Sequence, residues 1–267
     1  MQLFKLDSGE RPPIGKPFNE ISAVLTKAYI FTEKFIRNKS VLDCGCGGGY
    51  GSDYFARKKA KKVIGVDLSA RAIDNAKIFF KRDNLQFMEM DITHLSFRDC
   101  TFDLITSFQV IEHLKDYQKH LSEVKRVLKP GGIFITSTPN KKVTSPDREK
   151  PIFPFHFKEF CSNDLYALLG SFFKDVKVMG QKNIEKTTLR KEIEFGESWR
   201  MRVIRVISSF EIVRWMARLL PLKIKDFFTR PPTIFHKPED FEINEKYCED
   251  GYILIATCKK SEIKRFC

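Results

Sequence analysis

Residues 41–51 read Val-Leu-Asp-Cys-Gly-Cys-Gly-Gly-Gly-Tyr-Gly. The first three residues have the composition of a buried strand, and the glycines after them predict a tight loop that opens a helix. Glycine lets the backbone turn sharply and approach a ligand closely, while N–H groups at the start of a helix point toward that ligand. The stretch therefore predicts a strand, a ligand-binding loop and a helix, in that order.

The spacing of these glycines excludes two common phosphate-binding loops. A dinucleotide fingerprint would need glycines at positions 45, 47 and 50, and position 50 is tyrosine. No Gly-Lys-Ser/Thr follows, as a P-loop requires. Instead, Asp43 stands two residues before the first glycine, where its carboxylate would attract an ammonium group and repel a pyrophosphate.

From the loop to about residue 138, short β-rich runs alternate with stretches of helical periodicity. We expect strands at 41–43, 62–66, 85–90, 102–107 and 133–137, and helices at 50–58, 70–80 and 117–128. A further helix is expected at 162–169, a sixth strand at 173–179 and a last strand at 252–258. This alternation predicts an α/β fold, a doubly wound parallel sheet with helices on both faces.

Acidic residues stand at the ends of three successive strands. Beyond Asp43, Asp67 lies 22 residues after Gly45, where a carboxylate suits two ribose hydroxyls. Asp91 ends the third strand, where its side chain and the next amide can hold an adenine edge. Any one of these acids alone reads as a helix cap or a solvated loop residue. Together, at the edge where open α/β sheets bind ligands, they describe a site for S-adenosylmethionine.

Five short motifs, in this order and spacing, resemble those of the class I S-adenosylmethionine-dependent methyltransferases. They are Val-Leu-Asp-Cys-Gly-Cys-Gly at 41–47, Val-Asp-Leu-Ser at 66–69, Phe-Asp-Leu-Ile at 102–105, Val-Ile-Glu-His-Leu at 110–114 and Leu-Lys-Pro-Gly-Gly at 128–132. The resemblance implies a Rossmann-like sheet of seven strands, mostly parallel, with strand 7 antiparallel between strands 5 and 6. It also implies S-adenosyl-L-methionine as the methyl donor.

The same resemblance implies which residues contact the donor. The loop from Asp43 to Gly49 would face the methionine part, Asp67 the ribose, Asp91 with Ile92 the adenine, and the backbone near Gln109 the donor from the end of strand four. The expected donor-binding residues are Asp43, Gly45, Cys46, Gly47, Gly49, Asp67, Leu68, Asp91, Ile92 and Gln109.

We expect a single methyltransferase domain over residues 1–267. Within it, we expect an N-terminal segment and helix at 1–40, a donor-binding core at 41–181, a helical cap at 182–248 between strands 6 and 7, and the last strand at 249–260. Short stretches at 8–11, 137–140 and 154–160 resemble a bacterial and archaeal subgroup often associated with cell-surface glycan synthesis.

Two histidines are candidate catalytic bases, because an oxygen acceptor has to lose its proton during methyl transfer. His113 lies just past strand four on the ligand edge, and His156 lies in the aromatic loop after strand five. The alternative for His113 is a structural partnership with Glu112. The phenylalanines of that loop either wall the acceptor pocket or anchor the loop, and anchoring is the expectation for at least half of them.

The chain is basic, with a formal net charge of +13, and part of the excess lies in the expected cap. Between Arg200 and Arg230, eight Lys or Arg residues stand against two acids. The polar face changes phase near residue 208, so we expect two short helices over the acceptor site rather than one membrane-surface helix. Basic residues there could meet a phosphate or carboxylate, or an anionic membrane, whereas a hydrophobic surface of the cap could equally form a homodimer interface.

The seven cysteines show no paired CxxC spacing, which argues against a disulfide framework and against a zinc site. No metal site is therefore expected. No secretory signal is evident, and charges interrupt the apolar stretch from Val203 to Leu220, so it does not read as a membrane span. We expect a cytoplasmic protein, with contact to the inner membrane face as an option.

The leading hypothesis is O-methylation of a small polar acceptor such as a sugar or glycan precursor. The alternatives are a lipid acceptor at the membrane surface and a donor-binding scaffold without catalysis. Nucleic acid is a disfavoured acceptor, because strand four continues as Ser-Phe-Gln-Val at 107–110 and lacks the Asn/Asp-Pro-Pro-Tyr/Phe motif for base amino groups.

Overall fold

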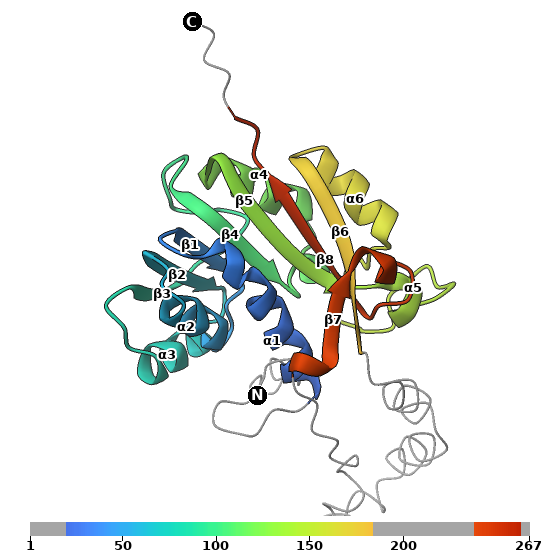
Figure 1. Ribbon diagram of the computed structural model, residues 1–267, viewed down its shortest axis with the longest axis horizontal. Helices are drawn as coiled ribbons and strands as arrows, with labels where there is room; N and C mark the ends of the chain where they lie inside the picture. The colour runs from blue at the N-terminus through green and yellow to red at the C-terminus, as the bar shows by residue number, and fades with distance from the viewer. Residues whose placement is uncertain (1–19, 184–237, 263–267) are drawn as a thin grey trace, which may run out of the picture.

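The computed structural model describes residues 20–183 and 238–262, which form one sheet with helices on both faces (Figure 1). The strands are β1 (Ser40–Cys44), β2 (Lys62–Asp67), β3 (Leu85–Glu89), β4 (Phe102–Phe108), β5 (Leu128–Pro139), β6 (Lys174–Asn183), β7 (Phe241–Asn244) and β8 (Ile253–Lys259). The α-helices are α1 (Glu20–Thr32), α2 (Tyr50–Arg57), α3 (Ala70–Phe79), α4 (Tyr117–Val127), α5 (Lys141–Thr144) and α6 (Ser162–Gly170). Four single turns of 3₁₀ helix complete the set: η1 (Glu33–Phe35), η2 (Ile111–His113), η3 (Pro238–Asp240) and η4 (Glu245–Tyr247).

The sheet has the order β3-β2-β1-β4-β5-β8-β6-β7. Neighbouring strands from β3 to β5 are parallel, and β8 lies antiparallel between β5 and β6. The predicted mostly parallel sheet, with its last long strand reversed between strands five and six, is confirmed. Because β1 lies at the centre of the parallel part, its carboxyl end has β2 on one side and β4 on the other.

The expected count of seven strands is wrong, because the sheet formed by residues 20–183 and 238–262 already has eight. The additional strand, β7, pairs antiparallel with the end of β6 at the sheet edge. It has only four residues, which is too short to show a strand periodicity in the sequence. Its position also corrects the ends of the expected cap at 182–248, since residues 182–183 belong to β6 and 241–244 to β7. The remainder, residues 184–237, lies outside the described residues, as do the basic helices expected there.

Strand β5 begins earlier than expected, because the Lys-Pro-Gly-Gly stretch at 129–132 is part of it. This stretch forms an irregularity in the pairing of β5 with β4. Leu128 pairs with Phe102, and the next partners are Ile133 and Leu104, so four residues of β5 stand against one of β4. Gly131 has a φ of +70°, which accommodates the local turn.

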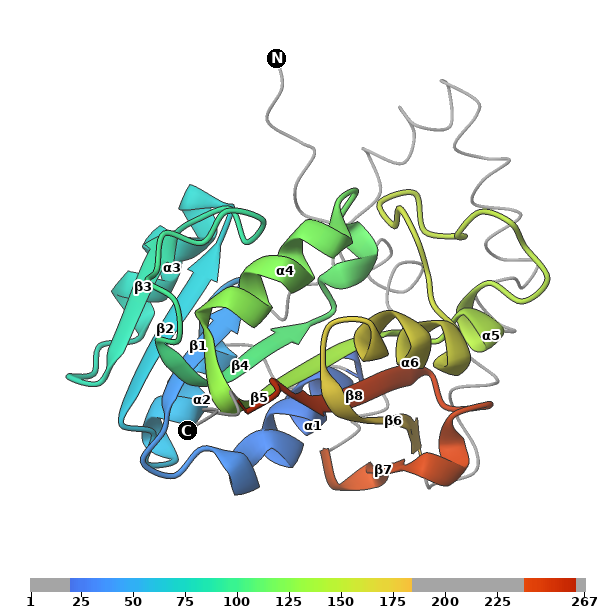
Figure 2. The ribbon, with the colours of Figure 1, turned by 90° about the horizontal axis from the view of Figure 1, so that it is seen from above.

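Two apolar clusters hold the helices against the sheet. On one face, α4 and α6 pack on residues such as Leu42, Ile105 and Phe134. On the other face, α1, α2 and α3 pack on residues such as Val41 and Val63. Figure 2 shows α4 and α6 on one side of the sheet and α1 on the other. None of the helices in the described part of the chain is long and apolar enough to cross a membrane.

Helices α2 and α3 each begin directly after a strand, so that their N-termini lie at the carboxyl edge of the sheet. Ser69 caps α3, since its hydroxyl accepts a hydrogen bond from the Ala72 N–H at 3.3 Å. Asp116 caps α4 in the same way, accepting from the Lys119 N–H at 3.0 Å. These caps place polar loops and helix N-termini along a single edge.

A buried histidine in α4 predicts a pH-dependent stability. Burial lowers the pKa of His120 to about 4, and its Nδ1 donates to the Ile92 carbonyl at 3.2 Å. Because the unfolded chain binds this proton with a pKa near 6.5, the free energy of unfolding is highest above pH 6.5 and falls as the pH drops toward 4. We expect up to about 3 kcal/mol of this loss to disappear in His120→Gln. Urea unfolding of both proteins across this pH range measures it, and parallel pH profiles would contradict the assignment.

Candidate functional site

The loop between β1 and α2 is built on three glycines with left-handed backbone. Gly45, Gly47 and Gly49 have φ values of +74°, +52° and +83°, which other residues seldom adopt. A Cβ on Gly45 would lie 2.4 Å from Cγ2 of Val110, so that glycine also permits close packing. A Cβ on Gly47 would meet nothing within 4 Å. The loop is therefore packed against Val110 at Gly45 and has free space for a ligand at Gly47.

The packing of Gly45 against Val110 predicts a specific rescue. Gly45→Ala is expected to destabilise the protein by about 2 kcal/mol, from steric overlap and from the positive φ. Adding Val110→Ala removes the overlapping methyl groups and should restore part of that loss. Thermal unfolding of the single and double variants measures the coupling. Equal stability of Gly45→Ala with and without the second substitution would show that the overlap is not what the glycine avoids.

Asp67, at the end of β2, accepts one backbone hydrogen bond from this loop and one from the start of α3. Its Oδ2 accepts from the Gly47 N–H at 2.9 Å, and its Oδ1 accepts from the Ser69 N–H at 2.9 Å. The carbonyl of Val66 accepts from the first two N–H groups of the loop. The next side chain, Leu68, is 72% exposed at the same edge. The structure thus brings Asp67, Leu68 and the glycine loop together, and their contact with the donor stays a prediction.

Asp43 lies beneath the loop and is 1% exposed. Its Oδ2 accepts from the Ser52 hydroxyl at 2.7 Å, and its Oδ1 accepts from the Thr106 hydroxyl at 2.8 Å. Burial raises the pKa of this carboxyl to about 6, although hydrogen bonds from Ser52, Thr106 and Tyr29 act in the opposite direction. The side chain thus joins β1, α2 and β4 under the loop. Its direct contact with the donor's ammonium group stays a prediction, and this burial favours an action through the loop and through charge.

Asp91 and Ile92 follow β3 at the same edge. The Asp91 carboxylate is half exposed and accepts from the Thr93 N–H and hydroxyl, both at 2.8 Å. Burial acts to raise the pKa of Asp91, but hydrogen bonds from Thr93 and the nearby His94 outweigh it, and the pKa is lowered. The Met90 N–H donates to the Asp67 carbonyl at 3.0 Å, which keeps the ends of β2 and β3 together.

Gln109 directly follows β4 and has a φ of +55°, a value that is uncommon outside glycine. Its N–H donates to the Ser137 carbonyl at 3.0 Å, and its Nε2 donates to the Ser137 hydroxyl at 3.1 Å. The sharp turn leads directly to Val110, which packs on Gly45, and to η2. Backbone strain of this kind is often found at binding and catalytic sites. Here the strained turn lies between the glycine loop and the two candidate histidines.

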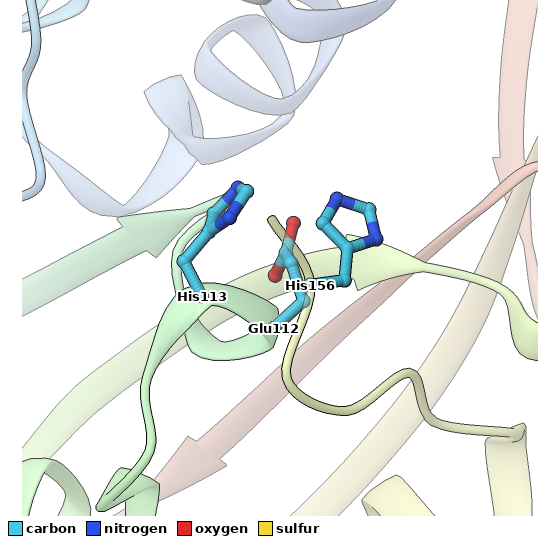
Figure 3. A group of neighbouring side chains, drawn as sticks. All are labelled: Glu112, His113 and His156. Carbon is cyan, nitrogen blue, oxygen red and sulfur yellow. The ribbon is translucent and has the colours of Figure 1, made fainter. Parts of the chain in front are cut away.

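Glu112, His113 and His156 form a cluster beside this turn, and Figure 3 shows the Glu112 carboxylate between the two imidazole rings. One ligand atom from each of the three residues lies within 4.8 Å of the others, and the two rings are 4.8 Å apart in an edge-to-face arrangement. Glu112 is 1% exposed, and its carboxylate oxygens have no hydrogen bond of standard geometry among the described residues. Burial raises the pKa of Glu112 to about 7, and His113 and the nearby Thr138 hydroxyl lower that value only in part.

Backbone and side-chain acceptors orient both histidines. The Nδ1 of His156 lies 2.7 Å from Oε1 of Glu159, and Oε2 of Glu159 accepts from the Thr144 hydroxyl at 2.8 Å. Burial acts to raise the pKa of Glu159, but its hydrogen bonds, led by that from His156, outweigh it and lower the pKa. The Nδ1 of His113 lies 3.1 Å from the Phe155 carbonyl, which can only accept. Both rings therefore carry their proton on Nδ1 when neutral.

Sequence reasoning found both histidines but did not identify the carboxylates as part of one site. The sequence interpretation considered Glu112 only as a structural partner of His113, the residue that follows it. Glu159 was missed, and its position three residues after His156 is a signal that could have found it. Of the loop's aromatic residues, Phe160 is buried, whereas Phe153, Phe155 and Phe157 are about half exposed, so anchoring accounts for fewer of them than expected.

Comparison with known proteins identifies related sequences over the same core. Residues 42–136 match the family described as a methyltransferase domain. A protein of Mycolicibacterium smegmatis, named as an S-adenosylmethionine-dependent methyltransferase, is 39% identical over 131 residues, which are 49% of this chain and 50% of that protein. The ubiquinone biosynthesis O-methyltransferase of Coxiella burnetii is 37% identical over 128 residues, 47% of this chain and 54% of that protein. The chain spans about half the length of the curated relatives it matches.

A solved structure shares the fold over more of the chain. The complex between the Haloferax volcanii Trm112 methyltransferase activator and a methyltransferase contains a chain with a TM-score of 0.57 and 16% identity. The match covers 90% of this chain and 89% of that one. At this identity the likeness shows the fold alone.

Proposed function

Since residues 42–136 form a domain of the class I S-adenosylmethionine-dependent methyltransferases, we propose that this enzyme methylates a hydroxyl oxygen of a small polar acceptor, such as a sugar or glycan precursor. The donor supplies a methyl group on a positively charged sulfur. The residues of the chain then have to hold donor and acceptor in line, exclude water and accept a proton.

One observation carries this proposal: the open glycine loop and a pair of oriented histidines lie on either side of a single turn. Gly47 offers unobstructed backbone, and Asp67 is hydrogen-bonded to that same residue. Val110 packs on Gly45 from one side of the turn, and His113 follows three residues later. A donor lying along the loop would therefore have its methyl group near the histidine cluster.

Proton transfer to a histidine suits an oxygen acceptor. In a neutral ring with the proton on Nδ1, Nε2 is the nitrogen that accepts a proton. The hydroxyl loses its proton to that nitrogen as its oxygen attacks the methyl carbon, and the carbon–sulfur bond breaks to leave S-adenosylhomocysteine. Hydrogen bonding to Glu159 stabilises the charged ring that His156 would become.

The choice of a sugar acceptor is supported by the short motifs at 8–11, 137–140 and 154–160, which resemble a glycan-associated subgroup. Transfer of labelled methyl from S-adenosylmethionine into fractionated extract of the source organism tests it. We expect label in the water-soluble sugar or glycan fraction. Label confined to lipid or nucleic acid would contradict the proposed acceptor but would still identify a methyltransferase. Tight donor binding without any label would favour a donor-binding scaffold without catalysis.

A lipid acceptor is the second candidate, and one surface feature favours it. Four large apolar side chains, Ile152, Phe153, Phe155 and Phe157, are 45–55% exposed around His156. An apolar rim of this kind suits an acceptor with a hydrocarbon part, and the name of the Coxiella relative points to such a pathway. A flotation assay with anionic vesicles distinguishes the two candidate acceptors. Only a lipid acceptor at the membrane requires the protein to bind the vesicles and float with them at low salt.

A further inference from the structure

The buried carboxylate of Glu112 has polar neighbours in Thr138, His113 and His156 but no hydrogen bond of standard geometry among the described residues. Both oxygens are fully enclosed. A buried polar group without a partner costs several kcal/mol when it is charged, so such groups normally bind an ion, a water molecule or a ligand. The backbone of Glu112 is well fixed, because its carbonyl accepts from the Phe157 N–H at 2.7 Å. The side chain lies between the two histidines, as Figure 3 shows.

The surroundings of His156 have the form of a metal-binding histidine. Protein histidines that bind metals usually donate their other ring N–H to a carboxylate or a carbonyl, which fixes the ring and its tautomer. The Nδ1 of His156 is 2.7 Å from Glu159, which Thr144 fixes in turn. The Nδ1 of His113 is 3.1 Å from the carbonyl of Phe155. Both rings thus have the outer partner of this pattern, and both stand beside the same carboxylate.

From this cluster we infer a binding site for a divalent first-row transition metal ion, held by Glu112, His113 and His156. Two imidazoles and one carboxylate are a donor set for Zn²⁺, Fe²⁺, Co²⁺ and similar ions, and they leave coordination positions open. The ligand atoms lie within 4.8 Å of one another. A tetrahedral site with bonds of about 2.0–2.1 Å needs separations of about 3.3 Å, so small side-chain rotations close the site. No cysteine takes part, which is why the cysteine spacing did not reveal it.

An acceptor would take one of the open positions, and this part of the inference rests on the proposed function. An acceptor hydroxyl bound to the ion would lose its proton to solvent more readily, because a bound metal lowers the pKa of a coordinated O–H group. The oxygen would then attack the methyl carbon as the carbon–sulfur bond breaks. In this form His113 and His156 bind the metal and do not act as bases.

Metal binding is tested on the full-length protein after removal of metals with a chelator. We expect Co²⁺ to bind with one ion per chain and to produce the visible absorption bands of a site with nitrogen ligands. Zn²⁺ should bind by calorimetry with the same stoichiometry and displace Co²⁺. If the unmodified protein shows neither stoichiometric binding nor Co²⁺ bands, the metal site is overturned, and this result needs no variant that might misfold.

Variants then assign the ligands. Glu112→Gln and His156→Gln should abolish the Co²⁺ bands, and Glu159→Gln, which acts through His156, should weaken Zn²⁺ binding by about 10–100-fold. The matched control is His94→Gln, an exposed histidine beside Asp91 with the same side-chain change. Binding that is lost in His94→Gln and retained in His156→Gln would overturn the assignment.

Donor affinity, measured by calorimetry in the same samples, distinguishes failure of the metal site from failure of the proposed function. S-adenosylmethionine binding without metal binding would overturn the metal site alone. Metal binding without S-adenosylmethionine binding would support the site and count against the proposed enzyme.

Discussion

Asp67→Ala is expected to weaken S-adenosylmethionine binding by at least about ten-fold. A carboxylate that accepts hydrogen bonds from two ribose hydroxyls contributes charge-assisted bonds, and each is typically worth 1.5–3 kcal/mol. In the folded protein the same carboxylate also accepts from the N–H groups of Gly47 and Ser69. The substitution therefore removes the proposed ribose contact and loosens the glycine loop, and both changes lower affinity. Titration calorimetry with purified protein measures the dissociation constant.

Two comparisons make the Asp67 result specific. Asp74→Ala removes an exposed aspartate from α3, one turn beyond the N-terminus of that helix, and should leave donor affinity unchanged. Asp67→Asn keeps the shape of the side chain and one carbonyl oxygen, so it should fall between the wild type and Asp67→Ala. Wild-type affinity in Asp67→Ala would remove Asp67 from the donor site.

His156→Gln is expected to reduce kcat by about 10²–10⁴-fold, the range that a positioned proton acceptor contributes. The glutamine amide can still donate to Glu159, which keeps that carboxylate paired, but it neither accepts the proton nor replaces an imidazole ligand. Since His156 lies in the loop after β5 and the glycine loop follows β1, donor affinity should stay within about two-fold of the wild type. Single-turnover methyl transfer with saturating donor measures the chemical step.

His94→Gln provides the matched control, because it makes the same change at an exposed position and should leave kcat unchanged. His113→Gln separates the two histidines: a loss as large as that of His156→Gln would mean that the pair acts as one unit. Full turnover by both His113→Gln and His156→Gln would exclude the cluster from catalysis and return it to a structural role.

Much of the fold could be predicted from the sequence because its signals are local. The glycine loop and the β-rich runs are short patterns, and the structure confirms the strands and the reversed strand β8. The three acids at strand ends could be predicted to share an edge, since parallel topology alone brings carboxyl ends together. The eighth strand could not, because β7 has four residues and exists through its pairing with β6.

What only the tertiary structure decided is the setting of each functional side chain. The sequence determined that Asp43 precedes the loop, and packing of β1, β4 and α2 decided that its carboxylate is enclosed by Ser52 and Thr106. Likewise, the sequence supplied His113 and His156 on separate segments, and the turn at Gln109 decided that they meet over Glu112. Distances between segments far apart in the chain depend on how side chains fill the space between layers, and no local pattern encodes that packing.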